Sequence, residues 1–276
     1  MKSTEYDVAV VGAGPGGSQT ARLLADRGHR VLVLEEHKSV GLPVHCSGFV
    51  TPRTLSEAGV SAGLVLNEVK GAVVHSPGGK PLELGGDKVR ALVLDREAVD
   101  VTIADRAASA GAEYQLRTKV EDICFGPSGA LLRAKEAFQW KDYKARLVVG
   151  ADGARSRVAA QIDRPEAQLI WCAGAELRLP DHPTDMVRIY VGSELAPGWF
   201  AWTIPMGGGS VRMGIGSVMG NTGEKPRKLL DNLIQSHPGH FRGMEITSFG
   251  GGFIPLYAPS KTYADRVLLV GDAALQ

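Results

Sequence analysis

Three glycines near the N-terminus have the spacing of a phosphate-binding turn. Gly12, Gly14 and Gly17 form the pattern G-x-G-x-x-G, between an apolar run at residues 7–11 and a helical pattern at residues 18–27. The first glycine permits a tight turn, the second lets the backbone approach a pyrophosphate, and the third lets helix and strand pack closely. The start of the helix adds free N–H groups and a partial positive charge. These residues predict a dinucleotide-binding turn.

A carboxylate follows at the place where such a site needs one. Gly28 ends the helical pattern, and the buried strand expected at residues 31–34 leads directly into Glu35. An acid at this point accepts both hydroxyls of a ribose, and it argues against a 2′-phosphate there. We therefore predict one βαβ unit that binds a dinucleotide, because the strands, the turn, the helix and the acid occur in the order that such a unit requires.

Two further acids lie at the ends of apolar runs. Asp152, followed by Gly153, comes after "ARLVVGA", and Asp272, preceded by Gly271, comes after "RVLLV". For Asp272, a carboxylate at a strand end suits a polyol chain and is a poor neighbour for a phosphate. The alternative for both acids is a plain N-cap of the helix expected after each of them.

The rest of the chain alternates between two kinds of pattern. A hairpin signal surrounds Pro77–Gly79, an amphipathic helix ends at Gly111, and alternating strands occupy residues 169–253, with one helix at 226–237. We expect an α/β fold in which a Rossmann-type nucleotide-binding domain is interrupted twice by a mostly antiparallel sheet domain. The predicted boundaries are 1–68, 95–166 and 262–276 for the first domain, and 69–94 and 167–261 for the second.

The composition excludes several classes of protein. The 276 residues are 44% hydrophobic, which is enough for a core, and the formal net charge of +1 gives no electrostatic footprint for nucleic acid. Cys46, Cys124 and Cys172 are unevenly spaced and form no C-x-x-C, so neither a disulfide framework nor a metal site is expected. No signal peptide or bilayer-crossing stretch is seen. We expect a cytoplasmic protein with at most peripheral membrane contact.

Four motifs in this chain occur in the order found in a known group of flavoenzymes. "VVGAGPGG", "LDR" at 94–96, "GADGARS" at 150–156 and "VGDAA" at 270–274 together resemble FAD-dependent enzymes with the para-hydroxybenzoate hydroxylase fold. The resemblance implies FAD, with its ADP half on the glycine-rich turn and Glu35, and a ribityl hydroxyl on Asp272. It further implies cofactor contacts at Glu36, Cys46, Arg96, Val120, Asp152, Gly153 and Gly271.

A second nicotinamide-binding unit is not expected. The run "GIGSVMG" at residues 214–220 has suggestive spacing, but it ends a strand and no helix opens from it. Electrons are therefore expected from a transiently bound NAD(P)H or from a protein donor of the ferredoxin type.

Within this fold the chain is most similar to geranylgeranyl reductases, which saturate isoprenoid double bonds. That family carries P-x-x-Y-x-W-x-F-P followed by G-x-G, and this chain has "PGWFAWTIP" at 197–205 and then Gly214-Ile215-Gly216. The motif tyrosine is Phe200 here and the motif phenylalanine is Ile204, so a role of the tyrosine hydroxyl is vacant or moved. The resemblance implies a prenyl-lipid substrate, bound by Trp199, Phe200, Trp202, Pro205, Gly214 and Gly216.

The main alternative is a flavin-dependent halogenase or hydroxylase. Halogenases carry W-x-W-x-I-P, and "WFAWTIP" supplies the second half of that motif but places Trp199 one position too early. A one-residue shift along a strand turns a ring to the other face. A structural alternative is that Trp199 and Trp202 only pack the sheet.

Reduction of an isolated alkene by hydride requires a proton at the other carbon, and positive charge develops on the substrate. Aromatic faces from Phe200 and Trp202 would stabilise that charge by about 1–2 kcal/mol each once water is excluded. The family's cysteine-containing loop has a counterpart in "GLPVHCSG", so His45 and Cys46, together with Tyr257, are candidates to relay the proton.

The chain ends at Gln276, where a helix that receives the flavin should begin. We expect a C-terminally truncated form of the family, with the isoalloxazine half of the site incomplete. A flavin-binding remnant without turnover is therefore a further alternative.

Overall fold

A computed structural model describes residues 5–162, 167–256 and 261–276, and these residues divide into two compact units. The first comprises Met1–Leu42, Glu97–Ala167 and Pro255–Gln276, and the second comprises Pro43–Arg96 and Gln168–Ile254. The chain thus leaves the first unit for the second twice and returns to the first twice. Residues 43–68, which the sequence assigned to the nucleotide-binding domain, lie in the second unit.

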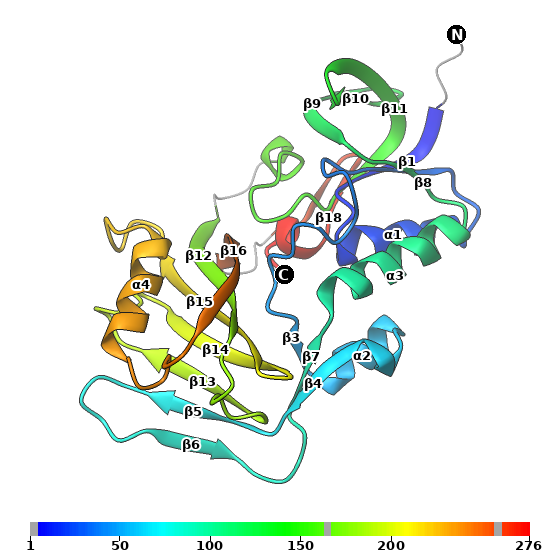
Figure 1. Ribbon diagram of the computed structural model, residues 1–276. Helices are drawn as coiled ribbons and strands as arrows, with labels where there is room; N and C mark the ends of the chain where they lie inside the picture. Colours follow the sequence, from blue (N-terminus) through cyan, green and yellow to red (C-terminus); the bar gives the residue numbers. More distant parts are fainter. Residues whose placement is uncertain (1–4, 163–166, 257–260) are drawn as a thin grey trace. The chain divides into compact units, whose positions relative to one another are not determined.

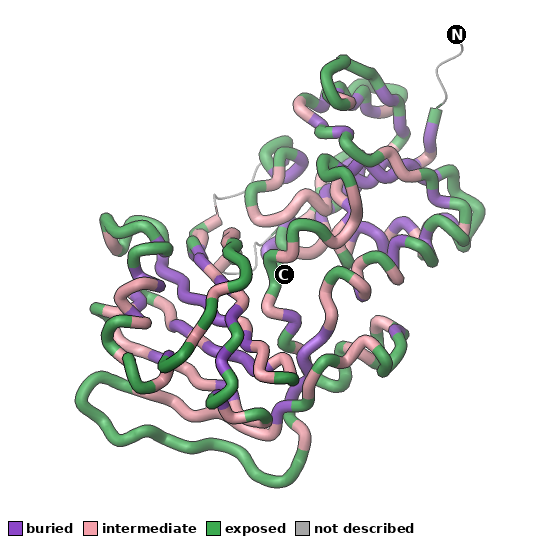
Figure 2. Tube along the Cα trace, in the orientation of Figure 1, coloured by how far each residue is buried: buried purple, intermediate pink, exposed green. Residues whose placement is uncertain are grey.

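The first unit contains a mostly parallel sheet in the order β17-β18-β11-β1-β2-β8 (Figure 1). Its central strands are fully or largely buried because both faces are covered, which explains their continuous apolar runs (Figure 2). The strands are β1 (Glu5–Val11), β2 (Val31–Leu34), β8 (Glu113–Gln115), β11 (Gln139–Gly150), β17 (Tyr263–Ala264) and β18 (Val267–Leu269); the helices are α1 (Pro15–Ala25) and α3 (Arg96–Ser109).

An antiparallel extension of this sheet was not predicted from the sequence. β10 (Gly129–Glu136) pairs with the first part of β11, and β9 (Thr118–Gly126) pairs with β10. Their inner side chains alternate with outer ones, and Val120, Leu132 and Ala134 are buried in the core. That period of two is visible in residues 118–136, so the signal was present.

A short 3-10 turn occurs near each of the two strand-end acids, Asp152 and Asp272. The segment after Gly150 forms only η2 (Ala159–Gln161), and the segment after β18 forms η3 (Gly271–Ala274). The expected α-helix after Asp152 is therefore wrong within the described residues.

The second unit is built on a seven-stranded sheet in the order β16-β12-β15-β14-β13-β5-β6. Its strands are β5 (Gly71–His75), β6 (Leu82–Gly85), β12 (Gln168–Arg178), β13 (Met186–Val191), β14 (Phe200–Gly207), β15 (Ser210–Val218) and β16 (Glu245–Leu256). All described pairings between these strands are antiparallel except β5 with β13. Helix α4 (Pro226–Ser236) buries Leu229, Leu230 and Leu233 against one face.

A three-stranded sheet packs on the opposite face of the large sheet in the second unit. It has the order β3-β7-β4, with β3 (Phe49–Val50), β4 (Val65–Val69) and β7 (Ala91–Leu94), and it is accompanied by α2 (Pro52–Ala58) and η1 (Ala62–Leu64). Val69 and Val93 of this sheet share a buried cluster with Val187 and Ile204 of the large sheet. One end of that face is therefore closed by apolar packing.

Candidate cofactor and substrate sites

The glycine-rich turn connects β1 to α1. At two of its glycines the surrounding backbone leaves no room for a side chain. Gly12 has a φ of +100°, and a Cβ there would clash with the carbonyl oxygen of Ala151. A Cβ at Gly17 would clash with the carbonyl oxygen of Gly12. These two glycines are required by the fold itself, because backbone from three segments meets at this point.

Gly14 differs from Gly12 and Gly17 because there is free space where its side chain would be. Its backbone is extended (φ −64°, ψ 176°), and a Cβ there would meet nothing within 4 Å. Gly14 is the N-cap of α1, no side chain caps the helix, and its first turn contains no acidic residue. The helix start thus presents N–H groups and a partial positive charge to an open cradle, which suits a pyrophosphate.

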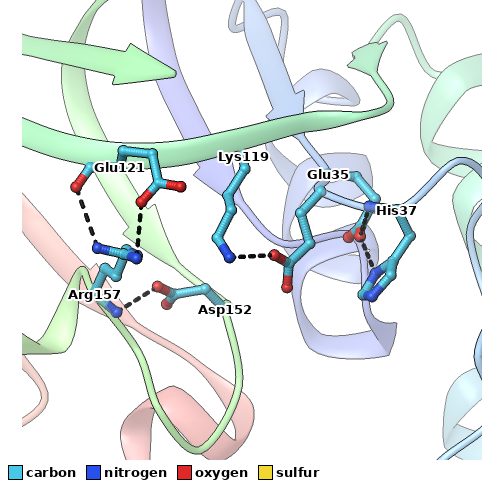
Figure 3. Close-up of polar contacts among 7 residues, drawn as sticks. Glu35, His37, Lys119, Glu121, Asp152 and Arg157 are labelled. Carbon is cyan, nitrogen blue, oxygen red and sulfur yellow. Dashed lines mark hydrogen bonds and ion pairs between the residues drawn. The ribbon is translucent and has the colours of Figure 1, made fainter. Parts of the chain in front are cut away.

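Glu35 is buried at the end of β2 and is fixed by three hydrogen bonds, of which Figure 3 shows those with His37. Its Oε2 accepts from the Ala13 N–H at 2.7 Å, while Oε1 accepts from the His37 N–H at 2.9 Å and lies 2.6 Å from His37 Nδ1. One oxygen therefore ties the acid to the turn, and the other holds it through His37. A contact of its remaining lone pairs with ribose hydroxyls stays a prediction. The sequence reasoning did not find His37.

Two ion pairs lie beside this carboxylate in the same unit (Figure 3). Lys119 Nζ is 3.2 Å from Glu36 Oε2, and Arg157 Nη2 is 2.8 Å from Glu121 Oε2. The Thr118 N–H donates to the Glu35 carbonyl at 2.8 Å, which holds the start of β9 against the end of β2. The Val120 side chain is buried in the core, so only its backbone could contact a cofactor.

Asp152 caps the loop that follows β11. Its Oδ2 accepts from the N–H groups of Arg157 at 2.7 Å and Val158 at 3.2 Å, and its Oδ1 accepts from the Ser156 hydroxyl. Burial raises the pKa of this carboxyl, and the same hydrogen bonds oppose the rise. Asp152 thus holds the loop through these hydrogen bonds, while the N-cap of the 3-10 turn that follows is Val158. A contact of Asp152 with FAD stays a prediction.

The second terminal acid lies where β18 ends. Gly271 has a φ of +60° in a turn, and Asp272 is exposed. A Cβ on Gly16, in the first turn of α1, would lie 3.7 Å from the Gly271 nitrogen. The end of β18 therefore lies beside the start of α1. Together, the open cradle at Gly14 and the fixed acid at Glu35 fit the ADP half of FAD.

In the second unit the G-x-G glycines make room for two indole rings. Trp202 on β14 pairs with Gly214 on β15, and a Cβ at Gly214 would clash with the Trp202 ring. A Cβ at Gly216 would lie 2.7 Å from Trp199 Cδ1. The two motifs are thus parts of one packing arrangement, which only the cross-strand register reveals. Direct substrate contact by these glycines stays a prediction.

Phe200 joins the two tryptophans in a half-buried aromatic group. Its ring stacks on Trp199 at 4.8 Å between centroids and meets Trp202 edge-on at 5.8 Å. Trp202 also packs against the cluster that contains Ile204, whereas the ring nitrogen of Trp199 is buried and has no hydrogen-bond partner in the described chain. Alternation along β14 directs the predicted substrate residue Pro205 to the other face.

The loop that carries Cys46 is tied to the same face of the sheet by Arg212. Arg212 donates to Glu176 Oε1 at 2.8 Å and to the Ser47 carbonyl at 3.0 Å. Gly48 has a φ of +69°, and a Cβ there would lie 2.6 Å from the Leu94 carbonyl oxygen. The loop is therefore closely fitted at its end. The sequence reasoning did not find Arg212, because its partners are remote in the chain.

The candidate proton donors of this loop are accessible. Cys46 and His45 are exposed, and the Gly48 N–H donates to the Cys46 sulfur at 3.5 Å. A Cβ on Gly252 of β16 would lie 3.8 Å from the His45 Cβ. Arg96 lies at the end of this region, with its Cγ beside Gly48. Tyr257 lies outside the described residues.

Comparisons with known proteins agree with this geometry. The model of an FAD binding domain matches residues 5–178, and the model of a geranylgeranyl reductase catalytic domain matches residues 171–254. A digeranylgeranylglycerophospholipid reductase from Methanosarcina mazei is 33% identical over 99% of this chain and 69% of its own length. Fold and site therefore define an FAD-dependent oxidoreductase.

Solved structures narrow the assignment. A geranylgeranyl bacteriochlorophyll reductase-like protein from Thermoplasma acidophilum has a TM-score of 0.87 at 28% identity, covering 98% of this chain and 72% of that protein. An aklavinone-11 hydroxylase in complex with FAD has a TM-score of 0.74 at 20% identity over 99% of this chain and 58% of its own, which shows the shared fold alone. The chain belongs to the geranylgeranyl reductase family. Three predictions are confirmed: the fold, the FAD cofactor, and the activity, which is the reduction of isoprenoid double bonds.

Proposed function

We propose that the substrate of this reductase is a glycerophospholipid with geranylgeranyl chains. The relatives' names support this substrate, and the observation that carries the proposal is the aromatic group of Trp199, Phe200 and Trp202. Trp199 and Trp202 lie over two glycines of β15, and Phe200 stacks on Trp199. A half-buried aromatic group of this kind suits an extended polyprenyl chain.

FAD, when bound and reduced, supplies the hydride, and the first unit holds its ADP half through the turn of Gly12, Gly14 and Gly17 and through Glu35. The faces of Phe200 and Trp202 stabilise positive charge on the prenyl chain, by about 1–2 kcal/mol each in a water-free setting. The rings also exclude water, which strengthens that stabilisation. Aromatic residues therefore serve here both as an apolar surface and as an electrostatic one.

Cys46 and His45 are our candidates to deliver the proton. Both are exposed side chains, and the loop that carries them is held at its end by Arg212. The loop's fit at Gly48 fixes the backbone while leaving these two side chains accessible. A thiol or an imidazolium ion provides the proton that the second alkene carbon requires.

The electron donor and the place of action are part of the same proposal. NAD(P)H or a ferredoxin-type protein reduces the flavin, and the enzyme works at the membrane surface where its lipid substrate resides. No helix in the described part of the chain is long and apolar enough to cross a bilayer.

The test uses the FAD-loaded protein under anaerobic conditions with dithionite as reductant. A digeranylgeranyl glycerophospholipid in detergent should gain two hydrogen atoms for each double bond reduced, as read by mass spectrometry. Trp202→Ala should lower turnover while FAD remains bound. Trp171→Ala is the matched control, because Trp171 is a partly exposed ring of the same sheet on a different strand. A lipid left unchanged by loaded wild-type protein, or equal turnover of both variants, would contradict the proposal.

A further inference from the structure

The turn between β10 and β11 presents two aromatic side chains to solvent. Phe138 is 93% exposed and Trp140 is 57% exposed. All residues from Ala137 to Lys141 are exposed, and the turn contributes to none of the core clusters described above (Figure 2). Aromatic side chains bury large areas where they contribute to a core. Packing in the core therefore does not explain why aromatic residues occur at this turn.

The backbone of this turn keeps the two rings at its tip. Glu136 pairs with Gln139, so only Ala137 and Phe138 lie between the strands. Ala137 has a φ of +51°, a region that favours glycine, and its N–H donates to the Arg117 carbonyl at 3.1 Å. The tip is thus anchored to neighbouring backbone and is not a loose loop.

The charge around the rings is mainly positive. Residues 129–146 contain five basic and two acidic side chains. Arg133 lies over the Trp140 ring at 5.1 Å from its centroid, and Lys141 pairs with Glu136 at 3.0 Å. Arg133 and Lys135 belong to the strand that lies beside Trp140. Aromatic rings at a tip with basic residues behind them are typical of surfaces that lie in a membrane interface.

We propose that the β10–β11 tip, defined as Ala137 to Trp140, inserts into the headgroup region of an anionic lipid bilayer. Phe138 and Trp140 enter the interface, and Arg133, Lys135 and Lys141 lie against the anionic headgroups. The proposal rests on the proposed function, since a lipid substrate must be reached at a bilayer. A protein partner is disfavoured because a stable protein interface needs on the order of 800 Å² from each side, far more than two side chains offer.

The experiment measures binding of the FAD-loaded protein to vesicles by flotation. Vesicles of phosphatidylglycerol with phosphatidylcholine are compared with vesicles of phosphatidylcholine alone, each at low and high salt. The wild type should bind the anionic vesicles more tightly, and salt should weaken that binding. Phe138→Ser and Trp140→Ser should each lower the partition coefficient roughly tenfold, and Lys135→Gln roughly fivefold.

Two controls keep the result specific. Leu82→Ser removes an apolar side chain of 57% exposure on β6 and should leave vesicle binding unchanged. FAD content and melting temperature should be the same in all variants, because Phe138 and Trp140 contact neither the core nor the cofactor turn. Brominated lipid should quench Trp140 fluorescence, and replacement by serine should remove that component.

Three outcomes would overturn the proposal: no vesicle binding by the wild type, equal binding to neutral and anionic vesicles, or unchanged binding of both aromatic variants. Turnover on detergent-dispersed lipid separates this failure from failure of the proposed function. If that turnover is normal while the tip variants bind vesicles like the wild type, the lipid substrate stands and the membrane tip is refuted.

Discussion

Gly14→Ala is expected to abolish tight FAD binding without harming the fold. A Cβ at this position meets no protein atom within 4 Å, and the backbone conformation of φ −64° and ψ 176° is open to alanine. The apoprotein should therefore keep its stability, or gain about 0.5 kcal/mol from the less flexible unfolded chain. The methyl group would instead occupy the cradle in front of α1.

The loss of affinity follows from what the methyl group displaces. A pyrophosphate at a helix start gains about 1–2 kcal/mol from the helix charge, and a charge-assisted hydrogen bond contributes about 1.5–3 kcal/mol. Loss of most of both terms, about 3 kcal/mol, corresponds to a Kd for FAD roughly 100-fold higher. Fluorescence titration of apoprotein with FAD measures this change, and thermal unfolding of the apoprotein measures the fold.

Matched variants make the test decisive. Gly86→Ala is a second glycine with open space and no positive φ, and it should leave both FAD affinity and stability unchanged. Gly12→Ala and Gly17→Ala should instead destabilise the apoprotein, since their Cβ atoms would clash with backbone. An unchanged Kd for Gly14→Ala, or a loss of FAD that accompanies a clear fall in apoprotein melting temperature, would refute the reasoning.

Three further predictions concern the second unit. Gly214→Ala should displace the Trp202 ring and lower lipid reduction as Trp202→Ala does, with FAD content unchanged; normal turnover would show that the ring is not needed. Burial lowers the pKa of His182 and of His240 to about 4, so protons bind the unfolded chain first, and the urea midpoint should fall as pH decreases from 7 towards 4. His240→Asn should flatten this dependence, and an equal slope would contradict the assignment. Arg212→Met should free the loop that carries the candidate proton donors and speed its cleavage by protease; a wild-type rate would show that the loop is held by other contacts.

The βαβ unit could be predicted from the sequence because its determinants are local. The apolar strands, the glycine spacing and Glu35 all lie within one short stretch, and each element forms from its own pattern. The hairpin of β5 and β6 and the helix α4 were found for the same reason. Local signals also misled: the turn after Asp152 has the residues of a helix start, but the segment continues only as a 3-10 turn.

Contacts between segments far apart in the chain had to come from the tertiary structure. Lys119 reaches Glu36 because β9 is fixed against the end of β2. In the sequence, Trp202 and Gly214 belong to two separate motifs. The strand register pairs them, so that the Trp202 ring lies over Gly214. Sequence patterns report the conformation that a segment prefers by itself. Which side chains meet depends on strand order and register, which the burial of the whole core decides.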